Sequence, residues 1–380
     1  MTETSVAAAN DTPTNSARHV PRWRDPTTTT ALATIAHVLI AVATGWFLLQ
    51  QLAPVVRPLL VAIFLAYILL PYHSRLRKQI GGAASIGVLA GVTGAFLLSI
   101  ALVTYASLLG LSEDIPRLHS RAGELARTFE DTIGELPHWA SSLKPSSPTE
   151  SKIGEQLARA TGPLLSVAAD VLLESIIIAM YLLFLLLEGS RFPDRVRRAY
   201  SSDRAEEILF IAGQVSAAIA GYLRVKVKAS LVLAVPVGVI LWLCGVKFAM
   251  LWAVLTFLCN FIPYIGPVMA YTLPVGFAFL WFGASWQPVT AAGLLLCCHA
   301  ASAAVVEPTM IGNAVGLSPL VLLAALAFWG LLWGIPGMFL AVPLTVVSVI
   351  VMNHFESTRP VAKLLRGGEH VAAAFSEISL

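Results

Sequence analysis

The chain has 380 residues, of which 57% are hydrophobic and 12% are charged. Soluble globular proteins carry about 25% charged and about 45–50% apolar residues, so this composition excludes a soluble enzyme, a disordered chain and a fibrous repeat. The 25 Lys and Arg against 22 Asp and Glu leave a net charge of +3, which is too small to indicate a nucleic-acid partner. The sequence therefore predicts an all-α, multi-pass protein whose surroundings are a lipid bilayer.

Four long apolar runs in the first half predict transmembrane helices, since about 20 apolar residues cross the hydrocarbon core of a bilayer. They follow a polar segment at 1–30, which we interpret as a disordered tail and not as a cleaved signal peptide. The runs lie at 31–49, 54–72, 83–110 and 164–187, so that 31–110 holds the first three expected spans.

The segment 111–163 between the third and fourth spans is predicted to contain an amphipathic helix. Its apolar side chains recur every three or four positions, as on one face of a helix. They are Leu118, Ala122, Leu125, Phe129, Ile133 and Leu136. Such a helix would lie on the membrane surface or against a neighbouring subunit. We therefore expect a homo-oligomer, for which a ring such as a pentamer is one arrangement.

The segment 188–228, after the fourth span (164–187), is basic. Asp203 is expected to cap a second amphipathic helix there. The apolar stripe of that helix would consist of Ile208, Ile211, Val215, Ala218 and Tyr222. Because Lys and Arg gather in cytoplasmic loops, we expect the segment and both tails (1–30 and 353–380) to be cytoplasmic, with 111–163 outside. The expected location is the cytoplasmic membrane.

Six shorter apolar runs form the expected core of the protein at 229–352. They lie at 229–245, 248–262, 266–283, 287–306, 318–333 and 335–352. Several have fewer than 18 residues and contain Pro or Gly, as re-entrant segments do. Since both termini are expected inside, the number of crossings is even, which eight and ten both satisfy.

This core is nearly free of charge, because Lys247 and Glu307 are its only charged side chains between 229 and 350. A charge at the bilayer centre costs roughly 2.5–3.5 kcal/mol. Glu307 is therefore either a functional acid or a solvated residue at the membrane interface. His299, two helical turns earlier, is either its proton partner or a packing residue. Asp170 and Glu174 share one face of the fourth span; Asp170 is expected at the interface, and Glu174 is a weaker candidate acid.

Helix-breaking residues interrupt the core at three places. Pro removes a backbone donor, and Gly permits close approach or a positive φ. The first group is Asn260, Pro263, Tyr264, Gly266 and Pro267; the second is Glu307, Pro308, Gly312, Gly316 and Pro319; the third is Gly334, Gly337 and Pro343. Freed carbonyl groups must face protein or a watery cavity. The groups therefore mark either a transport pathway or simply kinked helices.

The core also shows an internal similarity. A shift of 71 residues superposes 245–270 on 316–341 with seven identical positions of 26, among them Gly266 on Gly337. Either this is chance in Leu- and Ala-rich sequence, or the core contains an inverted repeat of the kind that recurs in transporters.

No enzyme motif is present. The chain lacks G-x-x-x-x-G-K-[ST], H-E-x-x-H and G-x-S-x-G, so neither ATP hydrolysis nor a common membrane hydrolase is indicated. The four cysteines have no metal-ligand spacing. We expect no enzymatic activity, no cofactor and no metal.

Four motifs in order resemble the autoinducer-2 exporter family of bacterial membrane proteins. They are N-F-I-P-Y-I-G-P at 260–267, V-E-P-T-M-I-G at 306–312, G-L-S-P-L at 316–320 and W-G-I-P-G-M-F-L-A-V-P-L at 333–344. The resemblance implies about eight transmembrane helices and export of the quorum-sensing furanone autoinducer-2, or sodium/proton exchange as in some members. It also implies that the residues of the three breaks line the pathway. This chain lacks the Gln that often precedes the acidic position in the family.

The sequence thus predicts a secondary transporter that moves a small polar solute outward, with Glu307 carrying H⁺ or Na⁺. A Na⁺/H⁺ antiporter is the alternative within transport. A membrane scaffold that assembles partners through 111–163 is the alternative from another class.

Overall fold

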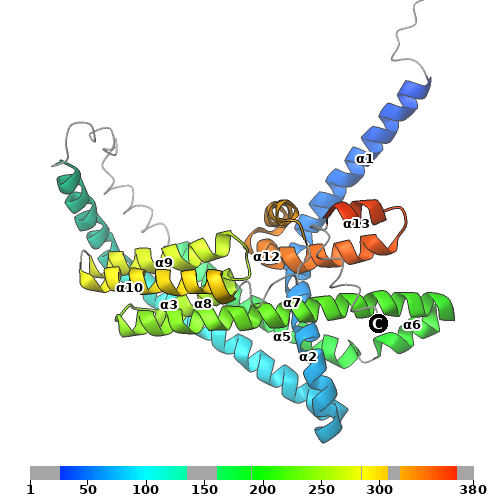
Figure 1. Cartoon of the computed structure of the whole chain (residues 1–380), viewed down its shortest axis with the longest axis horizontal. Helices are drawn as coiled ribbons and strands as arrows, with labels where there is room; N and C mark the ends of the chain where they lie inside the picture. The colour runs from blue at the N-terminus through cyan, green and yellow to red at the C-terminus, as the bar shows by residue number, and fades with distance from the viewer. Residues whose placement is uncertain (1–25, 135–160, 190, 284, 307–316, 366–380) are drawn as a thin grey trace, which may run out of the picture. The chain divides into compact units, whose positions relative to one another are not determined.

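The structure is a computed structural model of the chain. It describes residues 26–134, 161–189, 191–283, 285–306 and 317–365. Every regular element in these ranges is a helix, which confirms the predicted all-α class. Eight of the described helices are long and apolar enough to cross a membrane, in agreement with the predicted number of about eight. Figure 1 shows the helices in chain order.

Helix α1 (Pro26–Gln51) belongs to a first unit, Met1–Leu52, and is described by itself. Large apolar side chains around its surface are exposed, including Ile40 and Phe47. A helix that is apolar on all sides is typical of a membrane span. The helix therefore agrees with the first predicted span.

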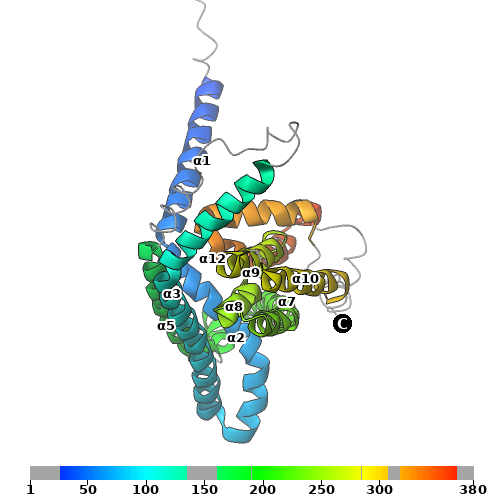
Figure 2. The ribbon, with the colours of Figure 1, turned by 90° about the vertical axis from the view of Figure 1, so that its left-hand side faces the viewer.

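The second unit begins with α2 (Ala53–Ile80), α3 (Gly82–Gly134) and α5 (Thr161–Gly189), which pack against one another. Gly81 alone joins α2 to α3 with a φ of +86°, a conformation that glycine adopts without steric cost. Figure 2 shows this tight turn at the lower end of the two helices. Ala62, Ile86 and Leu182 lie in the shared core.

Helix α3 is continuous across the predicted boundary at 110/111. The third span and the start of the amphipathic segment are thus one helix, and Leu118 of the predicted stripe is buried in an apolar core. Leu136 lies outside the described residues, as do the side chains of the other stripe residues.

Helix α6 (Phe192–Ala199) precedes α7 (Ser202–Leu243), a single helix of 42 residues. The boundary expected at 228 falls inside α7, so the amphipathic helix and the next span are continuous. The expected cap was wrong: Ser201 is the N-cap residue, and Asp203 lies in the first turn, where a carboxylate still interacts favourably with the helix dipole. Val215, Ala218 and Tyr222 pack in the apolar core as the stripe predicted.

The following helices are α8 (Ala249–Cys259), α9 (Ile265–Phe282) and α10 (Trp286–Ala301), the last continued by a π-helical turn, Ser302–Val306. Helix α8 has 11 residues, which at 1.5 Å per residue is only about 16 Å long. It is therefore too short to cross a membrane, as expected for a re-entrant segment.

The last helices are α12 (Pro319–His354) and α13 (Arg359–Leu365). Helix α12 is interrupted at Gly334, whose φ of 69° and ψ of −145° are not helical. Figures 1 and 2 show that its two arms, 319–333 and 335–354, run in different directions. The two arms coincide with the last two predicted apolar runs.

Candidate functional site

The first break in the core lies between α8 and α9 and holds the N-F-I-P-Y motif. The amide of Ile262 donates to the carbonyl of Cys259 at 2.8 Å, and the amide of Gly266 donates to that of Ile262 at 3.0 Å. Pro263 has no amide hydrogen to donate, and Tyr264 adopts a φ of 62°. The helix therefore ends at Cys259 and restarts in a new direction at Ile265.

Gly266, near the start of α9, lies directly against the end of α8. A Cβ atom on Gly266 would overlap with the carbonyl group of Cys259. Gly337, the residue that the internal similarity pairs with Gly266, has the same property, because a Cβ there would overlap with the carbonyl group of Trp329. In a continuous helix, residues seven or eight apart are separated by about 10–12 Å, so the chain folds sharply back on itself at both glycines.

The two breaks contact each other. The ring of Phe261 in the first break stacks on that of Phe339, which lies in the third, with centroids 4.6 Å apart. Ile262 packs in one apolar cluster with Leu326 and Ala341, from the two arms of α12. The structure thus brings together the two segments that carry the first and third groups of predicted pathway residues.

Among the other predicted pathway residues, Pro263 and Pro267 are half-buried, Pro343 is buried, and Tyr264 and Pro319 are exposed. Pro319 is the first residue of α12, a position where the missing amide hydrogen costs nothing. Glu307, Pro308, Gly312 and Gly316 lie outside the described residues.

Buried polar groups lie directly beside the first break. Asn260 is 3% exposed, and its Nδ2 donates to Oγ of Ser230 on α7 at 3.0 Å. Its Oδ1 has no hydrogen-bond partner among the described residues. The same holds for Oγ1 of Thr256, one helical turn before Asn260 and fully buried. An unsatisfied buried polar group costs about 1–3 kcal/mol, and these two lie one helical turn apart at the end of α8, which makes them the candidate contacts for a polar ligand.

Helix α7 contributes a stripe of polar residues to the same region. Tyr222, Lys226 and Ser230 are spaced by four, so they share one helix face, and all three are buried. Lys226 and Ser230 were not among the predicted site residues, because the basic residues of 188–228 were interpreted as a cytoplasmic segment. The spacing of 222, 226 and 230 was the available signal. A buried cation on a long apolar helix is a candidate functional residue.

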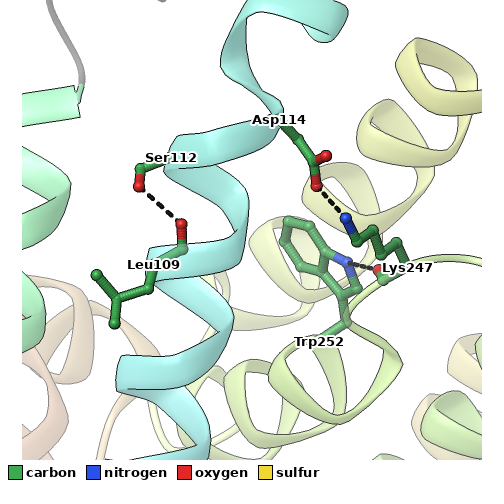
Figure 3. A network of polar contacts seen from close by, with 5 residues as sticks. All are labelled: Leu109, Ser112, Asp114, Lys247 and Trp252. Carbon is green, nitrogen blue, oxygen red and sulfur yellow. Dashed lines mark hydrogen bonds and ion pairs between the residues drawn. The ribbon is translucent and has the colours of Figure 1, made fainter.

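Lys247, the other charge of the predicted core, has a structural role. It lies between α7 and α8 and forms an ion pair with Asp114 of α3, while its carbonyl accepts a hydrogen bond from Nε1 of Trp252 (Figure 3). Arg117, on the next turn of α3, lies 4.2 Å from the ring centroid of Trp281. These contacts fasten α3 to the end of the core.

The remaining candidate titratable groups lie apart from the break. His299 on α10 contacts the ring of Tyr271 with centroids 5.9 Å apart, which favours the packing interpretation. Asp170 is exposed and Glu174 half-buried on α5. Within the described portion of the chain, no group of three or more His, Cys, Asp or Glu residues could hold a metal.

Several known proteins are similar in sequence to this chain over most of its length. The family model described as "AI-2E family transporter" matches residues 35–357. The chain is 28% identical to "Putative transport protein YhhT" of Escherichia coli (strain K12) over 342 residues, which cover 87% of this chain and 95% of that protein. It is 26% identical to "AI-2 transport protein TqsA" of the same strain over 332 residues, which cover 82% of this chain and 90% of that protein.

Proposed function

The chain belongs to the AI-2E family of transporters, and we propose on this basis that it exports a small polar solute, autoinducer-2, across the bacterial cytoplasmic membrane. The family consists of transporters and permeases, and the chain is accordingly a multi-pass membrane protein. One relative is named as a transport protein for AI-2. We also propose that both termini are cytoplasmic and that the protein has no enzymatic activity.

The observation that carries the proposal is the pair of unsatisfied buried groups at the first break, Oδ1 of Asn260 and Oγ1 of Thr256. Autoinducer-2 is a hydroxylated furanone, so it offers several O–H donors and ether and hydroxyl acceptors. The Asn260 oxygen would accept a hydroxyl hydrogen of the solute, and the Thr256 hydroxyl would donate or accept. A solute that satisfies both groups removes the cost of their burial.

The backbone of the break adds to this site. Among the described residues, no backbone amide donates to the carbonyls of Asn260 or Phe261, because Pro263 and the turn at Tyr264 end the helical pattern. Broken helices of this kind, at the contact of two repeats, form the solute sites of many secondary transporters. Gly266 and Gly337 let the backbone approach that closely, and Phe261 and Phe339 connect the two breaks.

Glu307 is proposed as the coupling residue, on the evidence of its sequence alone. It is the only acid between 229 and 350 and precedes Pro308, a residue type that has no amide hydrogen to donate. An acid in that position would bind H⁺ or Na⁺ on one side and release it on the other as the protein changes conformation. Since the chain has no ATP-binding motif, such an ion gradient would drive export.

Two isosteric or near-isosteric changes test the proposed solute site. Thr256→Val and Asn260→Leu should each raise the KM for autoinducer-2 efflux from proteoliposomes by roughly tenfold, because a lost hydrogen bond in a buried site is worth about 1–1.5 kcal/mol. Thr272→Val is the matched control, since Thr272 is exposed on α9 and donates to its own helix at Val268. An unchanged KM in both folded variants would place the solute elsewhere.

A further inference from the structure

A cavity of about 530 Å³ lies between α2 and α5, away from the breaks of the core. Its lining comes from one face of α2 and from the end of α5: Leu70, His73, Ser74, Arg77, Lys78 and Leu186. The α2 residues lie at positions i, i+3, i+4, i+7 and i+8, so they follow a single helix face. The volume falls within the range of roughly 300–1,000 Å³ that is typical of small-molecule sites.

The lining changes from apolar to basic along α2. Leu70 and Leu186 form the apolar end of the cavity, and Arg77 and Lys78 form its basic end, about two helical turns further along α2. Helix α2 has 28 residues and is therefore about 42 Å long, against about 30 Å for the hydrocarbon core of a bilayer. The basic end, in the last turns of α2, accordingly reaches the level of the lipid headgroups.

Within the part of the chain that the structure describes, no acidic side chain neutralises the positive charge of this cavity. No carboxylate among the described residues pairs with Arg77 or Lys78. Glu188, the acid closest in sequence to Leu186, forms an ion pair with Arg195 instead. Two cations are therefore free to bind an anion from outside the chain.

His73 is held in a fixed position at the wall of the cavity. Its side chain is 8% exposed, and its Nδ1 lies 2.8 Å from Oγ of the fully buried Ser85 on α3. The Ser85 hydroxyl donates to the carbonyl of Gly82 at 3.0 Å, so its oxygen accepts the hydrogen of His73 Nδ1. These hydrogen bonds connect His73, at the wall of the cavity, to the first turn of α3, directly after the tight turn between α2 and α3.

We propose that this cavity binds the headgroup of an anionic phospholipid. Arg77 and Lys78 would donate to the phosphodiester oxygens, while Leu70 and Leu186 would contact the first carbons of an acyl chain. Basic pockets between transmembrane helices at the membrane surface bind anionic lipids in this way. The lipid would pack against α2 and α5 beside the α2–α3 turn and stabilise that corner of the protein.

Lipid binding to the purified full-length protein in detergent tests the proposal. Native mass spectrometry would compare phosphatidylglycerol with phosphatidylcholine of the same acyl chains. We expect the wild type to prefer phosphatidylglycerol by about tenfold or more, and the double variant Arg77→Gln/Lys78→Gln to lose that preference. Ser74→Phe should also lose it, because it fills the cavity without changing the charge.

The matched control is Arg197→Gln/Arg198→Gln, which removes two exposed charges from α6 outside the cavity and should keep the preference. Glycerol phosphate at millimolar concentration should not displace the lipid, because it lacks acyl chains. Equal losses in both double variants, an unchanged preference in Arg77→Gln/Lys78→Gln, or displacement by glycerol phosphate would each overturn the lipid site.

Discussion

Replacing Gly266 or Gly337 by leucine should reduce transport by at least about tenfold while membrane insertion is retained. Each glycine lies against a backbone carbonyl of the preceding helix, where any Cβ would overlap. Backbone cannot move aside as the end of a flexible side chain can, and overpacking of this kind costs about 1–3 kcal/mol or more. The breaks would open, and Asn260 and Thr256 would no longer hold their positions. Solute efflux from proteoliposomes measures the effect.

Gly276→Leu in α9 is the matched control, because nothing lies within 4 Å of a Cβ built there. It should insert and transport as the wild type does. Wild-type transport by the Gly266 and Gly337 variants would show that the close contact is dispensable. Variants that are made but never fold would instead support the view that the two glycines serve only the packing of kinked helices.

Glu307→Gln should abolish ion-driven transport in a folded protein. Glutamine keeps the shape and much of the hydrogen bonding of glutamate but stays neutral, so it cannot exchange a proton or attract a cation. Efflux measured with and without an imposed pH or Na⁺ gradient should become independent of the gradient. Any uncoupled leak of solute would persist, because the proposed solute site at Asn260 is unchanged.

Two further variants make this result specific. Glu307→Asp keeps the charge and should remain partly active with a shifted pH profile. Glu113→Gln removes an exposed acid of α3 and should behave as the wild type. Gradient-driven efflux at the wild-type rate in Glu307→Gln, with the same pH profile, would make Glu307 an interface residue. The solute would then cross through the helix break without coupling to an ion, as in a facilitator.

Hydropathy and helix breakers predicted most of the fold. The limits of α9 and of the two arms of α12 agree with the apolar runs to within two residues, because Tyr264, Gly283 and Gly334 interrupt the helices at Pro- and Gly-rich positions. The paired role of Gly266 and Gly337 was also visible in the internal similarity. Both require close backbone contact, which only glycine permits.

Tertiary partners were not predictable in the same way. Ser230 and Asn260 are 30 residues apart, and no local pattern tells which polar residues of α7 face the break. The positive-inside rule counts charges and ignores helix faces, so it gave no indication that Lys226 would be buried on the same face of α7 as Ser230. The ion pair between Lys247 and Asp114 was likewise not predictable, because the two residues are 133 positions apart in the chain.

Efflux of autoinducer-2 from liposomes that contain the purified protein tests the central claim most directly. Preloaded vesicles would be diluted into medium that imposes an inward proton or sodium gradient, and the signal outside would be measured over time. We predict efflux faster than from protein-free vesicles, accelerated by one of the two gradients. Efflux no faster than from protein-free vesicles under either gradient, with the protein folded and inserted, would contradict export and favour a scaffold.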